Sequence, residues 1–342
     1  MPSTTKRVMF VTNSLSGGGA ERATNILVNA LQDSGTKVSL IAINRSAKDL
    51  IEPNCQVFEL NRPWNGGLGT VVKAYFSTQS AIWKWKPDVL VLNCDLPEFL
   101  GSMTIGKHSL VAVEHATYPW VKRLTLGRII RRILAGRKTK WVAVSDHLDI
   151  WENETIPKVI KNPIPYGYLE TNFMNAPISR LNYVGRLSEE KQPKWALEIA
   201  KDVEIPLRVI GDGHLMPDLV NYSTIFNIDV EFLGYVSDPW SDFENSDLLI
   251  IPSAFEGDGL VLVEAAARGI PVLLSDIPDL RRFNLPDQNY CKNVEAFSRS
   301  IKLNIKSIEN LRILRDDVGN VLNGRDPAYV AEEWNKFLDS IA

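Results

Sequence analysis

Short apolar runs alternate with longer amphipathic stretches along most of the chain. The runs in the first half are apolar at consecutive positions, which is typical of parallel strands that helices cover on both faces. A loop with several glycines follows the first run, and we expect a helix over about residues 20–32. The strands expected in this half cover residues 7–12, 38–43, 89–92, 110–113 and 141–144.

The pattern changes near residues 159–165, where Pro163 and Pro165 exclude a continuous helix. Residues 170–177 have the composition of a loop, so we interpret this stretch as a linker. The alternation then restarts, with a helix expected over 194–203. The strands expected in this half cover residues 181–184, 207–210, 230–233, 248–251 and 272–274, and a last helix covers about 328–340.

This organisation predicts an α/β protein with two doubly wound domains. The length of 342 residues suits two domains that each bury a core of their own. We expect an N-terminal domain over 1–165, a C-terminal domain over 166–325 and a final helix over 326–342.

Composition and charge exclude several classes of protein. The chain is 45% hydrophobic and 23% charged, with a net charge of −3, which excludes a wholly basic nucleic-acid binder. Residues 1–165 hold 21 Lys and Arg against 13 Asp and Glu, whereas the remainder holds 17 against 28. No secretory signal or apolar run of about 18 residues is found, so we expect a cytoplasmic protein. Three widely spaced cysteines argue against a disulfide framework and a structural zinc site: Cys55, Cys94 and Cys291.

The strongest chemical signal is a segment that follows an apolar run and opens a helical stretch. Its glycines let the backbone approach a ligand, and the first N–H groups of the helix can bind an anion. Glu264 lies four residues after Leu260, about 6 Å further along the same helix face. Two carboxylates beside an anion site match a ligand with hydroxyls and phosphates, although a surface acid beside a helix cap is the alternative. The segment comprises Glu256, Gly257, Asp258, Gly259 and Leu260.

A second motif, residues 184–191, follows the first expected strand of the C-terminal domain and contains Arg186 and Lys191. Either cation alone would be interpreted as a solvated loop residue. Both together, ahead of the carboxylate segment, favour a functional role.

These two motifs resemble those of the retaining glycosyltransferases of family 4, of the type that builds bacterial cell-surface polysaccharides. The resemblance implies the GT-B fold: two Rossmann-like domains facing each other across a cleft, with the C-terminal helix crossing back to the N-terminal domain. It implies that Glu256 holds hydroxyls of the donor sugar, Glu264 the ribose, and Arg186 and Lys191 the diphosphate. Breaking the bond between sugar and phosphate builds negative charge on the leaving diphosphate, and without a metal, fixed cations must stabilise it. The match weakens after Asp276, where residues 279–283 replace the family's Gly-x-x-Glu.

The glycine loop with Gly18 and Gly19 opens the first expected helix. It fails as a dinucleotide fingerprint, because Arg22 occupies the third glycine position and no acid closes the second strand. The resemblance implies that this loop borders the donor diphosphate and the acceptor, whereas a tight structural turn is the alternative. It also implies that His115, just after an expected strand, contacts the transferred sugar.

Glycine turns follow two expected strands of the C-terminal domain, at residues 211–213 and 233–236. Ligands of open α/β sheets bind at the carboxyl ends of strands. The resemblance implies that the nucleobase lies near Tyr235 and Val236, while simple turns remain the alternative. No histidine pair has the spacing of a zinc protease site, so we expect no metal. The histidines expected to be structural are His108, His147 and His214.

Residues 122–140 hold eight basic residues and no acid. We expect a helix here that packs Leu126, Ile129, Ile130, Ile133 and Leu134 inward and exposes Arg128, Arg131 and Arg132. Such a helix is common, but this density of cations favours an anionic membrane surface or a phosphorylated acceptor over nucleic acid, since no stacking aromatics are interleaved. The eight are Lys122, Arg123, Arg128, Arg131, Arg132, Arg137, Lys138 and Lys140.

The sequence therefore predicts a metal-independent, retaining transfer of a hexose or N-acetylhexosamine from a nucleotide diphosphate sugar, most simply UDP-linked. The acceptor would be a saccharide or a lipid-linked saccharide, and the protein could lie at the inner face of the cytoplasmic membrane. No cofactor is expected besides the sugar nucleotide. Two alternatives remain open, a nucleotide-sugar 2-epimerase of the same architecture and a non-catalytic sugar-nucleotide binding protein.

Overall fold

The computed structural model describes residues 6–15, 18–46, 52–115, 120, 123–146, 157–164, 176–311, 319 and 321–341. The chain divides into two compact units. Unit 1 comprises Met1–Pro165 and Gly324–Ala342, and unit 2 comprises Tyr166–Asn323. Gly324 and Arg325, which we expected in the second domain, therefore group with the first unit. The expected linker, residues 170–177, and His147 fall largely or wholly outside the described residues.

Unit 1 is built on a seven-stranded parallel sheet with the order β3-β2-β1-β4-β5-β6-β7. Its central strands are almost wholly buried, as their continuous apolar sequences require. The strands at 56–62 and 158–159 had not been expected, because their sequences lack a clear apolar run. The strands are β1 (Arg7–Thr12), β2 (Lys37–Asn44), β3 (Gln56–Arg62), β4 (Val89–Asn93), β5 (Ser109–Glu114), β6 (Lys140–Ala143) and β7 (Lys158–Val159).

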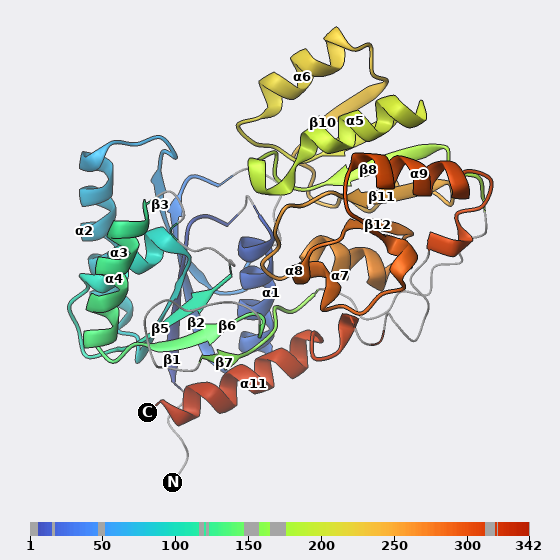
Figure 1. The fold of residues 1–342 in the computed structure, drawn as a ribbon. Helices are drawn as coiled ribbons and strands as arrows, with labels where there is room; N and C mark the ends of the chain where they lie inside the picture. Colours follow the sequence, from blue (N-terminus) through green and yellow to red (C-terminus); the bar gives the residue numbers. More distant parts are fainter. Residues whose placement is uncertain are drawn as a thin grey trace. The chain divides into compact units, whose positions relative to one another are not determined.

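Helices cover both faces of this sheet (Figure 1). One apolar core lies under the first and last helices of the unit, and another lies under the three helices between them. The helices of the first face are α1 (Gly19–Asp33) and α11 (Pro327–Ser340), and those of the second are α2 (Leu68–Trp85), α3 (Asp95–Ser102) and α4 (Leu124–Gly136).

The C-terminal helix α11 belongs to the core of unit 1. Asp326 caps its start, because its carboxylate accepts hydrogen bonds from the N–H groups of Ala328 and Tyr329, both at 3.0 Å. Trp334 is buried, and its ring lies 5.8 Å from that of Phe10 on β1. The last residues of the chain thus complete the core that the first strand begins.

Helix α4 forms where the basic segment predicts a helix, but the predicted assignment of its faces is wrong for Ile129, Ile133 and Arg131. The buried residues are Gly127, Ile130, Arg131 and Leu134, while Ile129 and Ile133 are exposed. Arg131 is buried because two buried carboxylates neutralise it. Its Nη2 lies 3.0 Å from Glu98 Oε1 and 2.5 Å from Glu114 Oε2.

Unit 2 is built on a six-stranded parallel sheet with the order β10-β9-β8-β11-β12-β13. The chain order reverses beside β8, so that β8 lies between β9 and β11. Such a switch point is where open α/β sheets form their ligand sites. The strands are β8 (Arg180–Val184), β9 (Leu207–Ile210), β10 (Val230–Gly234), β11 (Asp247–Ile251), β12 (Val272–Ser275) and β13 (Tyr290–Cys291).

The helices of unit 2 also lie on both faces of its sheet (Figure 1). Three helices, α5 (Pro193–Val203), α6 (Met216–Ile225) and α9 (Val294–Asn304), share one large apolar core with β8, β9 and β11. Short 3₁₀ turns lie at Glu189–Lys191, Asp287–Asn289 and Glu309–Leu311. The helices are α5 (Pro193–Val203), α6 (Met216–Ile225), α7 (Leu260–Ala267), α8 (Pro278–Arg281) and α9 (Val294–Asn304).

Candidate active site

The residues expected to bind the donor fall into two groups, one in each unit. In unit 2, the two motifs follow β8 and β11, which are neighbours in the sheet. Because both strands are parallel, their carboxyl ends meet at one edge. The sheet therefore brings the Arg186–Lys191 segment and the carboxylate segment together, although they are far apart in the sequence.

Lys191 and Glu256 form the closest link between the two motifs. Lys191 Nζ lies 2.7 Å from Glu256 Oε1, which also accepts a hydrogen bond from Ser253 Oγ at 2.7 Å. Glu256 is buried and Lys191 is partly exposed. The backbone joins the same loops, because the N–H of Ala254 donates to the carbonyl of Glu190 at 2.9 Å. One cation and one carboxylate are thereby held in fixed positions at the switch point.

Tyr183, on the buried strand β8, supports the turn that carries Arg186. Its hydroxyl donates to the carbonyl oxygen of Arg186 at 2.9 Å. Burial raises the pKa of this phenol well above its usual range, and the negative charges of Glu256 and Glu190 raise it further. Tyr183 therefore stays protonated as a donor, and Arg186, carried on this turn, is exposed.

The glycine turn after β9 packs against the same segment. Gly211 has a φ of +140°, and a Cβ on it would come 1.9 Å from the carbonyl oxygen of Gly185. A Cβ on Gly213 would come 2.3 Å from the carbonyl oxygen of Leu187. The Leu187 N–H donates to Asp212 O at 3.0 Å. Glycine is required at both positions, because the backbone of this turn packs closely against the backbone of the Arg186 turn. The turn after β9 therefore helps to shape the Arg186 turn and does more than reverse the chain.

The segment after β12 braces the loop that carries Glu256. The carboxylate of Asp279, on α8, accepts a hydrogen bond from the Glu256 N–H at 2.8 Å. Arg282 donates to the Gly257 carbonyl at 3.2 Å, and its guanidinium lies 3.7 Å from the Asp258 carboxylate. The region where the family resemblance weakens is therefore in contact with the strongest motif.

Helix α7 begins after Gly259, whose φ of +65° is in the left-handed region that glycine adopts readily. Glu264 lies within this helix, and its side chain is buried. Its Oε2 accepts a hydrogen bond from Trp240 Nε1 at 2.7 Å. Arg268 donates to the Glu264 carbonyl at 2.9 Å and lies over the Trp240 ring, 5.5 Å from its centre. These contacts position the carboxylate that we assign to the ribose.

Tyr235 and Val236 directly follow β10, at the same edge of the sheet. Tyr235 is exposed and Val236 is partly exposed. The carbonyl of Gly234 accepts a hydrogen bond from the Gly211 N–H at 2.7 Å, which ties this turn to the turn after β9. The structure thus places the expected nucleobase contacts two strands away from the Arg186 turn.

Several side chains of this site were missed from the sequence. They hold or orient the expected residues, and their separation along the chain hides their partnership. Ser253 is the one that local sequence could have indicated, because it is a polar residue three positions before Glu256. The others contact the site only because the fold brings distant segments together. The five side chains are Tyr183, Trp240, Ser253, Asp279 and Arg282.

In unit 1, Gly18 and Gly19 begin helix α1. Gly18 has an extended backbone and is the N-cap, and its carbonyl accepts a hydrogen bond from the Arg22 N–H at 3.1 Å. Glu21 lies in the first turn, where a negative charge favours the helix dipole. The two glycines therefore lie at a helix N-terminus at the carboxyl end of β1.

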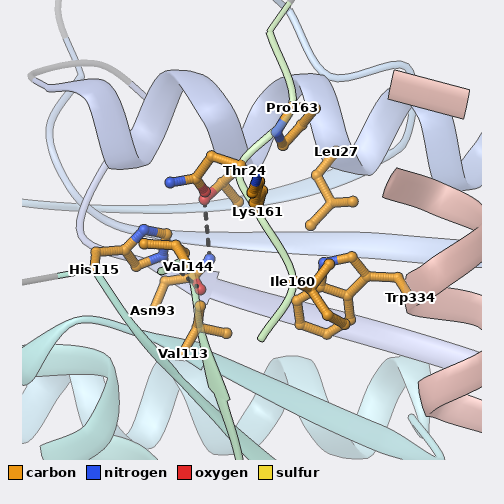
Figure 2. A pocket seen from close by; sticks show the side chains of 11 residues that line it. Thr24, Leu27, Asn93, Val113, His115, Val144, Ile160, Lys161, Pro163 and Trp334 are labelled. Atoms are coloured by element: carbon orange, nitrogen blue, oxygen red, sulfur yellow. Dashed lines mark hydrogen bonds between the residues drawn. The ribbon is translucent and has the colours of Figure 1, made fainter. Parts of the chain in front are cut away.

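His115 follows β5 directly, at the same edge of the unit 1 sheet. Its Nε2 lies 3.4 Å from Asn93 Oδ1, and Asn93 Nδ2 donates to Thr24 Oγ1 at 3.0 Å. Figure 2 shows these three side chains beside a cavity that Lys161 and Trp334 also line. The cavity has a volume of about 10 Å³, which is room for one water molecule at most. It is too small for a sugar.

Residues 179–320, nearly all of unit 2, match the family described as "Glycosyl transferases group 1". In structure, the chain is similar to Anabaena Alr3699/HepE, solved in complex with UDP and glucose. The TM-score is 0.78, with 16% identity over 98% of this chain and 100% of that chain. The fold is GT-B.

Curated relatives of this GT-B protein include glycosyltransferases that build lipid-linked glycans. The chain is 35% identical over 104 residues to the Escherichia coli UDP-Gal:alpha-D-GlcNAc-diphosphoundecaprenol alpha-1,3-galactosyltransferase, a match that spans 28% of this chain and 27% of that protein. It is 20% identical over 98% of its length to the Campylobacter jejuni GalNAc-alpha-(1->4)-GalNAc-alpha-(1->3)-diNAcBac-PP-undecaprenol alpha-1,4-N-acetyl-D-galactosaminyltransferase, of which it covers 99%. These comparisons support glycosyl transfer as the activity.

Proposed function

We propose that the protein is a retaining glycosyltransferase that moves a hexose or N-acetylhexosamine from a UDP-linked donor to a saccharide. The observation that carries this proposal is the Lys191–Glu256 pair at the switch point of unit 2. A binding protein needs contacts to the sugar nucleotide alone. A transferase also needs a fixed cation where the diphosphate leaves, next to a group that holds the sugar.

In the proposed reaction, the bond between the sugar's anomeric carbon and the diphosphate oxygen breaks, and the diphosphate keeps the electron pair. The acceptor hydroxyl oxygen bonds to the same face of that carbon, and its proton passes to the leaving phosphate. Lys191 and Arg186 stabilise the negative charge that develops, helped by the backbone amides of residues 257–260 at the start of α7.

The remaining assignments are those that the family resemblance implies. Glu256 accepts hydrogen bonds from hydroxyls of the donor sugar, and Glu264, held by Trp240, accepts those of the ribose. Tyr235 and Val236 contact the nucleobase. Gly18 and Gly19 border the donor diphosphate and the acceptor, and His115 contacts the transferred sugar. Fixed cations replace a metal, so that no metal ion takes part.

We propose that the acceptor is a lipid-linked saccharide in cell-surface glycan synthesis, because the E. coli and C. jejuni relatives are named for undecaprenol-linked saccharides. The basic segment that includes α4 would then contact the anionic inner face of the cytoplasmic membrane. None of the helices in the described parts of the chain is long and apolar enough to span a bilayer.

The test is a panel of nucleotide sugars incubated with the purified protein and a membrane extract, with and without chelator. We expect release of nucleotide diphosphate from one donor, dependent on the extract and insensitive to chelator. Interconversion of the donor without acceptor would establish the epimerase alternative instead. If every donor stays intact while UDP binds, the protein is a sugar-nucleotide binding protein.

A further inference from the structure

One surface of unit 1 exposes a stripe of large apolar side chains that the proposed active site does not use. On α2, Leu68 is 79% exposed and Phe76 is 65% exposed, with Val72 exposed between them. A spacing of four residues places all three on one face of the helix. Apolar side chains that recur along one helix face are unusual on a surface that contacts water alone.

The stripe continues across the loop after α3. Met103 and Ile105 are exposed, and Ile105 is 66% exposed. Gln79 of α2 holds this loop, since its side chain bonds both the carbonyl and the N–H of Ile105, at 2.7 and 2.8 Å. Tyr75 of α2 also donates to the Met103 carbonyl at 3.2 Å.

The same loop is joined to helix α4. Arg137, which ends α4, donates to the carbonyl oxygens of Gly101 and Ser102 at 2.8 and 3.0 Å. Helices α2, α3 and α4 all lie on one side of the unit 1 sheet (Figure 1). We call the exposed face of α2, residues 103–107 and α4 the α2–α4 surface.

The α2–α4 surface is cationic as well as apolar. Residues 63–145 contain twelve Lys and Arg but only four Asp and Glu. Two of these acids, Glu98 and Glu114, are buried against Arg131. Helices α2 and α4 contain no acid at all, so Asp95 is the single exposed acid of α2, α3 and α4. On α4, Arg128 and Arg132 are exposed beside Ile129 and Ile133.

We propose that the α2–α4 surface docks the protein on an anionic lipid bilayer. The side chains of Leu68, Phe76 and Ile105 enter the boundary between headgroups and acyl chains, while the α4 cations contact the phosphates. A second copy of the chain would suit the apolar stripe but would oppose cations with cations. An anionic bilayer satisfies both the apolar and the charged parts of the surface. This inference rests on the proposed function and extends it, because a protein docked on the bilayer can reach a lipid-linked acceptor.

The test is flotation of the full chain with vesicles of phosphatidylcholine alone or mixed with phosphatidylglycerol. We expect binding to the anionic vesicles, weakened by salt. Phe76→Ser should lower the partition coefficient on the order of tenfold or more, as should the double change Arg128→Glu and Arg132→Glu. Ile225→Ser is the matched control, because Ile225 on α6 of unit 2 is also 65% exposed. It should leave binding unchanged.

Equal binding by Phe76→Ser and the wild type would overturn the proposal. So would sedimentation velocity showing a wild-type dimer that Phe76→Ser converts to a monomer, since the stripe would then join two copies. Donor turnover in detergent, measured without vesicles, separates this inference from the proposed function. Turnover without flotation would refute the docking surface alone, and flotation without turnover would refute the transferase alone.

Discussion

Lys191 Nζ lies 2.7 Å from Glu256 Oε1, and the two residues follow neighbouring strands of the unit 2 sheet. If this cation stabilises the leaving diphosphate, Lys191→Ala should lower kcat by about 10²- to 10³-fold with donor. Lys194→Ala is the control, because Lys194 on the next helix pairs with Glu198 at 3.6 Å and lies outside the site. Equal turnover by the two variants would show that Lys191 has no part in the leaving-group step.

Asp279 should act through the loop that it holds. Asp279→Ala leaves the Glu256 N–H without this acceptor, so we expect kcat/KM to fall by about tenfold to a hundredfold. Asp279→Asn keeps an acceptor oxygen and should retain most of the activity. Thermal unfolding of both variants checks that the fold is intact. The bracing role is wrong if the alanine and asparagine variants have the same kinetic constants.

Trp240 should affect nucleotide affinity rather than the chemical step. Trp240→Phe keeps the aromatic packing but removes the N–H that donates to Glu264. We expect UDP binding, measured by calorimetry, to weaken about tenfold. Trp83→Phe, on α2 of unit 1, serves as the control because that side chain is exposed and belongs to another unit. Unchanged UDP affinity in Trp240→Phe would remove Glu264 from the ribose site.

Arg131 should be a stability residue. Arg131→Met leaves the buried carboxylates of Glu98 and Glu114 without their cation, so the free energy of unfolding should fall by about 3 to 5 kcal/mol. The exposed neighbour Arg132→Met should change it by less than about 0.5 kcal/mol. Urea unfolding measures both.

The loss in Arg131→Met should also depend on pH. Burial raises the pKa of the Glu98 carboxyl above 4.5 even with Arg131 present, and Arg131 opposes that rise. The folded state then holds a proton that the unfolded chain releases, so the free energy of unfolding falls as pH rises above 4.5. Because the variant lacks the opposing cation, we expect a larger fall that continues to higher pH than in the wild type. Parallel pH profiles would contradict this account.

His108 should contribute an opposite pH dependence. Burial, aided by the positive charge of Arg137, lowers the pKa of His108 from 6.5 to about 4. Between these values the unfolded chain binds a proton that the folded chain does not, so stability is lost as pH falls from 6.5 toward 4. His108→Gln should reduce this part of the acid sensitivity. Urea unfolding across this pH range would refute the prediction if both proteins lose stability equally.

The order of strands and helices was largely readable from the chain, because a strand buried on both faces must be apolar at consecutive positions. The expected strand at 38–43 is β2, Lys37–Asn44, and the expected last helix is α11, Pro327–Ser340. Strand β3 escaped notice since it lies at the sheet edge and alternates partly buried with exposed residues. Pattern alone therefore finds central strands better than edge strands.

Helix α4 shows where periodicity fails. An arginine normally stays in water, so the pattern assigned Arg131 to the exposed face and Ile129 and Ile133 to the core. Glu98 and Glu114 reverse that assignment, because they reach the helix from α3 and β5 and neutralise the buried charge. Their partnership with Arg131 is visible only when the three elements pack together.

In the candidate site, too, some features follow from local sequence and others only from the tertiary structure. Local sequence was enough to nominate candidate residues for a sugar-nucleotide site, because glycines before a helix, paired carboxylates and paired cations carry their chemistry within a few positions. The contacts that aim those residues join distant segments: Ser253 and Lys191 on Glu256, Trp240 on Glu264, and Asp279 on the Glu256 loop. Side chains meet across a sheet according to strand order, and strand order is set by the packing of the whole unit.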